Sequence, residues 1–193
     1  MRFAPRSRTL QNAPSLVSQR TCAGCTLCCE LLAIKAFDKA PGVLCSHCSA
    51  DHGCTIYEQR PEECRTFYCA YRTSTEFGEE WRPADCGLFV YFEGVHNRIN
   101  VMVDPASKAA WRNEPYFSKI RSMAIDMLHQ RGHLLVWEGL NVFAIMPDRE
   151  IELGVLGNRS VVVMGRTTTH GEEYNAMALA PDDPLWAQFQ PRG

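Results

Sequence analysis

The chain has 193 residues, a formal net charge of −2 at pH 7, 46% hydrophobic residues and 10% aromatic residues. This charge excludes the basic surface that nucleic-acid-binding proteins use and the polybasic patch that binds an anionic membrane. No run approaches the roughly 20 apolar residues of a transmembrane helix. The composition therefore predicts a globular protein whose partners include neither nucleic acid nor a membrane.

Residues 1–21 are polar and contain Pro5 and Pro14, so we predict a flexible leader. The leader has four arginines and no acid, but it lacks the continuous apolar segment of a secretory signal. We therefore expect a cytoplasmic protein. In such a reducing compartment, closely spaced cysteines favour a metal or redox site over structural disulfides.

A cysteine module is predicted over residues 22–86, and nine of the ten cysteines lie in its first 48 residues. Thiolates are soft ligands that select zinc, copper(I) or iron–sulfur clusters. The pairs Cys22/Cys25 and Cys45/Cys48 have the C-x2-C spacing of a two-knuckle zinc site. The predicted metal ligands are Cys22, Cys25, Cys28, Cys29, Cys45, Cys48, Cys54, Cys64 and Cys69.

Several neighbours of these ligands also carry expectations. Gly24 suits the tight turn of the first knuckle, and His47 and His52 are candidate extra ligands. Cys28 and Cys29 are adjacent, so we expect their side chains to point apart. The tenth cysteine, Cys86, is predicted to be a small buried apolar residue.

An iron–sulfur centre is the main alternative to zinc. Cys22, Cys25 and Cys28 repeat at the three-residue interval of bacterial ferredoxins. A ferredoxin run would continue with a fourth cysteine followed by proline, where this chain has Leu32 and Ala33. An iron–sulfur centre would therefore need a remote fourth ligand. The candidates for it are Cys45, Cys54 and Cys69.

Two helices are predicted inside the module. An apolar segment over residues 29–37 is expected to be helical and to end before Pro41-Gly42. A second helix, predicted over residues 61–72, would present Cys64 and Cys69 from consecutive turns.

Residues 87–193 have a different character and are predicted to form an α+β domain of unknown role. Strand-like runs over 87–93 and 98–104 predict a hairpin. Apolar residues at helical spacing predict a helix over 115–131, with Gly132 as its stop.

More strands are predicted after this helix, over 133–138, 141–146 and 151–156. A further strand over 160–167 is expected to pair with the last of them across the Gly157-Asn158 turn. A short turn is predicted near 185–189. The predicted fold class is α+β: a small loop-rich cysteine metal-binding module with short helices, followed by an antiparallel β meander with one central helix.

The cysteine pattern resembles the CxxCxxCC cysteine-cluster family (YkgJ type), which is described as a zinc- or iron-chelating domain. The resemblance covers 48 residues, about a quarter of the chain, and implies metal chelation without deciding between zinc and iron. Within it, Tyr57, Arg60, Pro61 and Phe67 are expected to be scaffold residues. The matching positions are Cys22, Cys25, Cys28, Cys29, Cys45, Cys48, Gly53, Cys54, Ile56, Tyr57, Arg60, Pro61, Cys64, Arg65, Phe67 and Cys69.

We therefore predict a metal-binding protein that chelates zinc or an iron–sulfur centre. One alternative is an iron–sulfur redox enzyme or electron carrier, and another is a metal-handling or metal-sensing factor.

No Ser/His/Asp triad or paired-carboxylate arrangement supports a catalytic residue. His129 and His133 have the i, i+4 spacing of a zinc-binding helix, but Gly132 interrupts them, so we expect a capping or surface role. Residues 87–193 are the expected surface for a protein partner.

Overall fold

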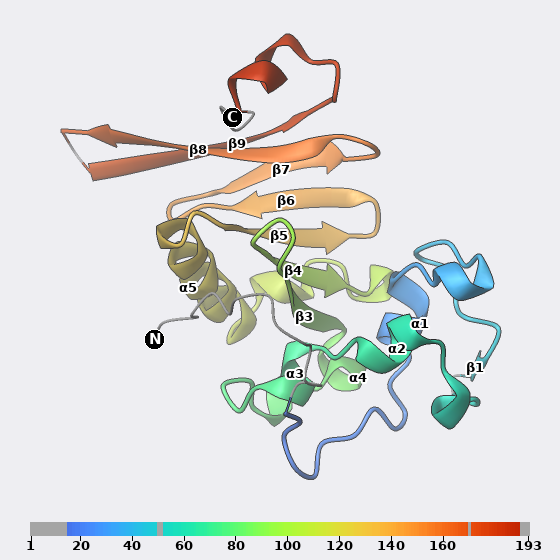
Figure 1. Ribbon diagram of the computed structural model, residues 1–193. Helices are drawn as coiled ribbons and strands as arrows, with labels where there is room; N and C mark the ends of the chain where they lie inside the picture. Colours follow the sequence, from blue (N-terminus) through green and yellow to red (C-terminus); the bar gives the residue numbers. More distant parts are fainter. Residues whose placement is uncertain (1–14, 50–51, 170, 190–193) are drawn as a thin grey trace.

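A five-stranded sheet lies at the centre of the protein (Figure 1). The computed structural model describes residues 15–49, 52–169 and 171–189. Of the predicted leader over residues 1–21, residues 1–14 lie outside the described ranges, whereas Val17 and Arg20 form hydrogen bonds to the carbonyls of Arg72 and Tyr71. The strand order follows the chain, and the strands are β3 (Leu88–Glu93), β4 (Arg98–Val103), β5 (His133–Glu138), β6 (Asn141–Ile145) and β7 (Glu150–Val155). The predicted α+β class is confirmed.

The longest helix of the described residues, α5 (Tyr116–His129), connects β4 to β5. Those two strands are parallel, whereas the other neighbouring pairs of the sheet are antiparallel. Parallel neighbours need a crossover connection, which α5 supplies. The predicted helix and strand order are therefore correct, and the central strand pair is the one departure from an antiparallel meander.

The helix does not end in the predicted way. The residue in the left-handed conformation is Arg131, with φ of 58°. Gly132 instead allows a close approach, because a Cβ atom there would lie 2.3 Å from both the Asn97 carbonyl oxygen and Met127 Cε. Gly132 thus lets the chain turn tightly from α5 into β5.

Helix α5 covers one face of the sheet and shares its core with the end of the cysteine module. Ile120 and Ala124 of α5 are fully buried against the sheet residues Leu134 and Val136. The same core contains Trp81 and three other module residues, so the module and the second half are packed together. These other residues are Tyr71, Phe77 and Cys86.

The opposite face of the sheet is covered in two places. Near β3, Leu27 and Leu31 of the cysteine module pack against Phe89. Over β5 and β6, a separate two-stranded hairpin packs on Leu135 and Val142. Figure 1 shows the module beside β3 and this hairpin at the β7 end of the sheet.

The hairpin consists of β8 (Ser160–Thr168) and β9 (Gly171–Leu179), with Ser160 opposite Leu179. The predicted pairing of residues 160–167 with 151–156 is therefore wrong, because β8 pairs with β9 and β7 pairs only with β6. The β9 strand was not predicted. The predicted terminal turn is present as η6 (Pro184–Gln188).

The module contains only short elements, as predicted. The predicted helix over 61–72 is wrong as a single helix, because it is broken at Phe67. The Phe67 ring leaves the helical path to pack edge-on against Phe89 and Tyr91, with ring centroids 6.0 and 5.4 Å apart. The predicted helix over 29–37 is likewise a helix followed by a separate 3-10 turn. The elements are α1 (Leu27–Leu31), η1 (Lys35–Phe37), β1 (Cys48–Ser49), β2 (Gly53–Cys54), η2 (Tyr57–Gln59), α2 (Glu62–Thr66), α3 (Ala70–Thr73), η3 (Glu79–Trp81) and α4 (Pro83–Cys86).

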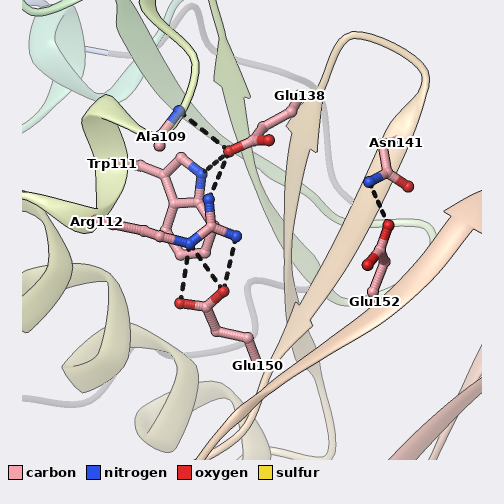
Figure 2. A network of polar contacts seen from close by, with 7 residues as sticks. All are labelled: Ala109, Trp111, Arg112, Glu138, Asn141, Glu150 and Glu152. Atoms are coloured by element: carbon pink, nitrogen blue, oxygen red, sulfur yellow. Dashed lines mark hydrogen bonds and ion pairs between the residues drawn. The ribbon is translucent and has the colours of Figure 1, made fainter.

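Two further 3-10 turns, η4 (Pro105–Ser107) and η5 (Ala110–Arg112), precede α5. A polar network connects η5 to the ends of β5 and β7 (Figure 2).

Among the described residues, no helix is both long enough and apolar enough to cross a bilayer.

Candidate metal centre

The cysteine module surrounds a cavity of about 220 Å³. Eight of the nine predicted ligands line this cavity, together with His47. The ninth, Cys48, does not line it, and the exposed His52 does not line it either. The eight are Cys22, Cys25, Cys28, Cys29, Cys45, Cys54, Cys64 and Cys69. We call this space the cysteine cavity.

Two tight turns carry the two C-x2-C pairs. The Cys25 N–H donates to the Cys22 carbonyl at 3.1 Å, and the Cys48 N–H donates to the Cys45 carbonyl at 2.9 Å. Gly24 has a φ of +70°, which a side chain would make unfavourable, as predicted for the first knuckle.

The remaining ligands come from three short elements and from the residue that precedes a fourth. Cys28 and Cys29 belong to α1, and Cys54 belongs to β2, where it lies opposite Cys48. Cys64 belongs to α2, whereas Cys69 has an extended backbone and directly precedes α3. The break at Phe67 therefore places Cys64 on α2 and Cys69 just before α3, instead of on consecutive turns of one helix.

The Cys29 thiol interacts with the thiols of Cys28 and Cys48, and the pKa values of all three are shifted by one another. Cys28 and Cys29 are expected to point apart, and both of them line the cysteine cavity. The hydrogen bond from Cys28 is the main reason that the pKa of Cys29 is lowered to about 6, with Cys48, Arg60 and Lys39 acting in the same direction. The same bond raises the pKa of Cys28, whereas burial, followed by the nearby Cys29, raises that of Cys48 to about 12.

Two other cavity cysteines accept hydrogen bonds from the backbone. Burial raises the pKa of Cys69 to about 11, and the N–H groups of Arg72 and Tyr71 oppose this effect at the sulfur atom. Burial also raises the pKa of Cys25, and the Leu27 N–H opposes it. Hydrogen bonds to sulfur stabilise thiolates, and they are one way in which proteins tune metal–thiolate centres.

The thiols line a common space without converging on one point. Within the described ranges, no group of three or more Cys, His, Asp or Glu side chains has an arrangement that could hold a metal ion. The structure therefore brings eight predicted ligands to one cavity, and it does not divide them among individual metal sites.

Two predicted scaffold residues are in contact with each other at the cavity wall. The Arg60 guanidinium lies 3.6 Å above the centre of the Tyr57 ring, and its Nε donates to the Tyr57 carbonyl at 2.7 Å. Its Nη1 donates to the Cys64 carbonyl at 3.5 Å. Arg60 therefore fixes the loop that leads into α2.

Cys86 lies away from the cavity. It is 8% exposed within the main core, and its thiol donates to the Leu88 carbonyl at 3.3 Å. The prediction of a small buried residue is confirmed.

His129 and His133 do not share a helix. His129 is the exposed last residue of α5, whereas His133 is the half-buried first residue of β5. The expected capping or surface role therefore describes the position of His129 better than that of His133.

Arg72 is the cavity residue that the sequence reasoning missed. It lines the cysteine cavity, is only 8% exposed, and lies outside the cysteine motif. Its position three residues after Cys69 carries no recognisable signal.

Comparison with known proteins does not place this chain in a family. No protein-family model, no curated protein and no solved structure matches it.

Proposed function

We propose that this chain is a metal-binding protein whose cysteine module holds zinc or an iron–sulfur centre. The observation that carries the proposal is that eight cysteines, from three short helices and strands and from the turns between them, line one cavity. These cysteines come from several separate turns and short elements of the module, and none of the ten is in a disulfide. The resemblance to the CxxCxxCC cysteine-cluster family supports the same function.

The number of thiols supports a centre larger than a single zinc ion. A tetrahedral structural zinc site takes about four ligands at metal–sulfur distances near ~2.3 Å. Eight thiols are twice that set, so we propose two ions or one polynuclear centre. His47 is a further ligand candidate at the same wall.

A metal would also explain how so loop-rich a module is held together. Apart from its contribution to the main core, the described part of the module has one small apolar cluster, in which Leu27 and Leu31 pack against Phe89 of β3. Metal binding supplies folding free energy to segments with a small core, because the ligands are brought together only in the folded state.

Anaerobic purification followed by elemental analysis and absorption spectroscopy tests this function. We expect either stoichiometric zinc in a colourless protein or iron and sulfide in a brown protein. An iron–sulfur centre would absorb near ~400 nm and bleach on reduction. Protein that binds neither zinc nor iron, before or after reconstitution, would contradict the proposal.

The iron–sulfur alternative gains support from the hydrogen bonds that the sulfur atoms of Cys25 and Cys69 accept from the backbone. Such bonds, together with solvent exposure, set the reduction potential of an iron–sulfur centre. A redox carrier would show reversible one-electron reduction without loss of iron. A colourless protein with stoichiometric zinc would exclude this second function.

A further inference from the structure

Arg72 is held rigidly at the wall of the cysteine cavity. It belongs to α3, and its N–H donates to the Cys69 carbonyl at 2.9 Å and also approaches the Cys69 sulfur. Its carbonyl accepts a hydrogen bond from the Val17 N–H at 2.8 Å. The backbone of Arg72 is thus fixed from both sides, directly beside a predicted metal ligand.

The side chain of Arg72 is buried without a partner. The residue is 8% exposed, and its Nε and Nη1 atoms are buried with no hydrogen-bond acceptor in the part of the chain that the structure describes. A guanidinium keeps its charge at all physiological pH values, so it cannot avoid this cost by losing a proton. A buried charge without a counter-charge is strongly unfavourable.

The other charged residues of the cavity wall do not supply that counter-charge. Among the described residues that line the cavity, three are arginines and one, Glu63, is an acid. Glu63 accepts a hydrogen bond from the Ala36 N–H at 2.8 Å. Of the other two arginines, Arg60 has carbonyl partners and Arg82 forms an ion pair with Asp85 at 3.0 Å. Of the three arginines, Arg72 is therefore the one whose side chain has neither a carbonyl nor a carboxylate partner among the described residues.

The thiols are the remaining source of negative charge in this wall. Metal binding deprotonates its cysteine ligands. Four thiolates around one divalent ion leave a net charge of −2, so a metal–thiolate centre is an anion. We propose that Arg72 is the counter-charge of this anionic centre and donates hydrogen bonds to its sulfur atoms. This inference rests on the proposed metal-binding function and adds a specific residue to it.

Replacing Arg72 in the full-length, metal-loaded protein tests the inference. We expect Arg72→Gln to weaken metal affinity about 10–100-fold, the range found for residues that support metal ligands from outside. Competition with a chromophoric chelator measures this change. If the metal is an iron–sulfur centre, the reduction potential of Arg72→Gln should also become more negative, because the added electron loses its nearby positive charge.

Two variants separate charge from structure. Arg72→Lys keeps the positive charge and should recover most of the affinity. Arg65→Gln removes an exposed arginine of the same module that does not line the cavity, so its affinity should stay within about twofold of the wild type, as expected for an exposed charge. Arg72→Met removes the charge but keeps an unbranched apolar side chain, and it replaces Arg72→Gln if that variant does not fold.

The outcomes distinguish this inference from the function on which it rests. If the wild-type protein binds no metal, the proposed function itself fails. If the wild type binds metal and the charge-removing variants bind it equally tightly, Arg72 is not the counter-charge. Acetate and phosphate test a different partner for Arg72, namely a small anion from solution. The inference fails if these anions raise the melting temperature of the wild type but not of Arg72→Gln, and if the two proteins bind metal equally tightly.

Discussion

Arg112 holds the Glu150 carboxylate through three hydrogen bonds (Figure 2). Its Nε lies 3.2 and 3.0 Å from the two carboxylate oxygens, and its Nη2 lies 2.8 Å from one of them. Its Nη1 donates to Glu138 at 2.8 Å, and Glu138 also accepts from the Trp111 indole. One guanidinium therefore connects η5 to two strands of the sheet.

We predict that Arg112→Met destabilises the protein by about 2 kcal/mol, because it leaves two partly buried carboxylates without a counter-charge. Chemical denaturation at pH 7 measures this change. The matched control is Arg166→Met, which removes an exposed ion pair with Glu173 on the β8/β9 hairpin and should cost less than about 1 kcal/mol. Equal effects of the two substitutions would show that the Arg112 network contributes no more than a surface pair.

Local patterns in the sequence predicted most of the central sheet. The strand predicted over 133–138 matches β5, and the predicted helix over 115–131 contains α5. These elements have apolar residues at the period of one secondary structure, and the same residues face the core. The periodicity of the sequence therefore carried enough information for each element alone.

The errors occurred where distant packing decided the structure. Gly157-Asn158 is a good local hairpin signal, but β8 pairs with β9, whose buried side is built from small or partly polar residues such as Ala176 and Tyr174. Alanine is a weak strand former, so β9 had no strong local pattern. The break at Phe67 likewise depends on two aromatic rings of β3 that are distant in sequence.

The cysteines that line the cavity were predictable from the sequence, whereas the other residues of its wall were not. Cysteine spacing identified eight of the residues that line the cavity, because thiols at such short intervals are typical of sites at which they act together. The sequence does not single out Arg72, because its distinguishing feature is a buried side chain without a hydrogen-bond partner, and burial depends on the three-dimensional structure.

We predict that Cys25→Ser lowers the metal content and destabilises the cysteine module, because Cys25 is a half-buried residue of the cavity wall. Cys86→Ser is the matched control: it changes the same atom at a buried core site, and the hydroxyl can still donate to the Leu88 carbonyl. We expect full metal content in Cys86→Ser. Elemental analysis of the purified variants decides the matter, and unchanged metal in Cys25→Ser would remove Cys25 from the ligand set.

Cys48→Ser should lose less metal than Cys25→Ser. Cys48 does not line the cavity, and its thiol acts on the cavity residue Cys29, whose pKa it lowers. The metal-to-protein ratios of the two variants, measured after the same purification, test this order. A complete loss of metal in Cys48→Ser would make Cys48 a direct ligand and would require β1 to move toward the cavity.

His133 should make the protein less stable in mild acid. Burial is the largest of the effects that lower its pKa to about 4, followed by Arg98 and His96, while Glu93 opposes them. The unfolded chain, with an ordinary histidine pKa near ~6.5, then binds more protons than the folded protein between pH 6.5 and 4. The contribution of His133 to the free energy of unfolding is therefore fully present above pH 6.5. It decreases as the pH falls from 6.5 to 4, by about 3 kcal/mol in total.

The variant His133→Leu tests this contribution, because leucine cannot be protonated. We predict a shallower loss of unfolding free energy between pH 6.5 and 4 than in the wild type, measured by urea denaturation at several pH values. His129→Leu, which removes the exposed histidine at the end of α5, should keep the wild-type slope. Identical slopes for His133→Leu and the wild type would mean that His133 titrates normally in the folded protein.

The turn after α5 provides a last test, in which two neighbouring residues respond in opposite ways. Gly132→Ala would place a Cβ atom 2.3 Å from the Asn97 carbonyl oxygen, so the backbone of the β3–β4 turn must shift, at a cost of about 2 kcal/mol or more. Arg131→Gly should be neutral or stabilising by up to about 1 kcal/mol, because glycine adopts the left-handed conformation of that residue without strain. Gly139→Ala, at φ of +63° in open space, isolates the cost of positive φ alone and should be milder than Gly132→Ala. If Gly132→Ala and Gly139→Ala have equal melting temperatures, the close approach to Asn97 does not explain the glycine.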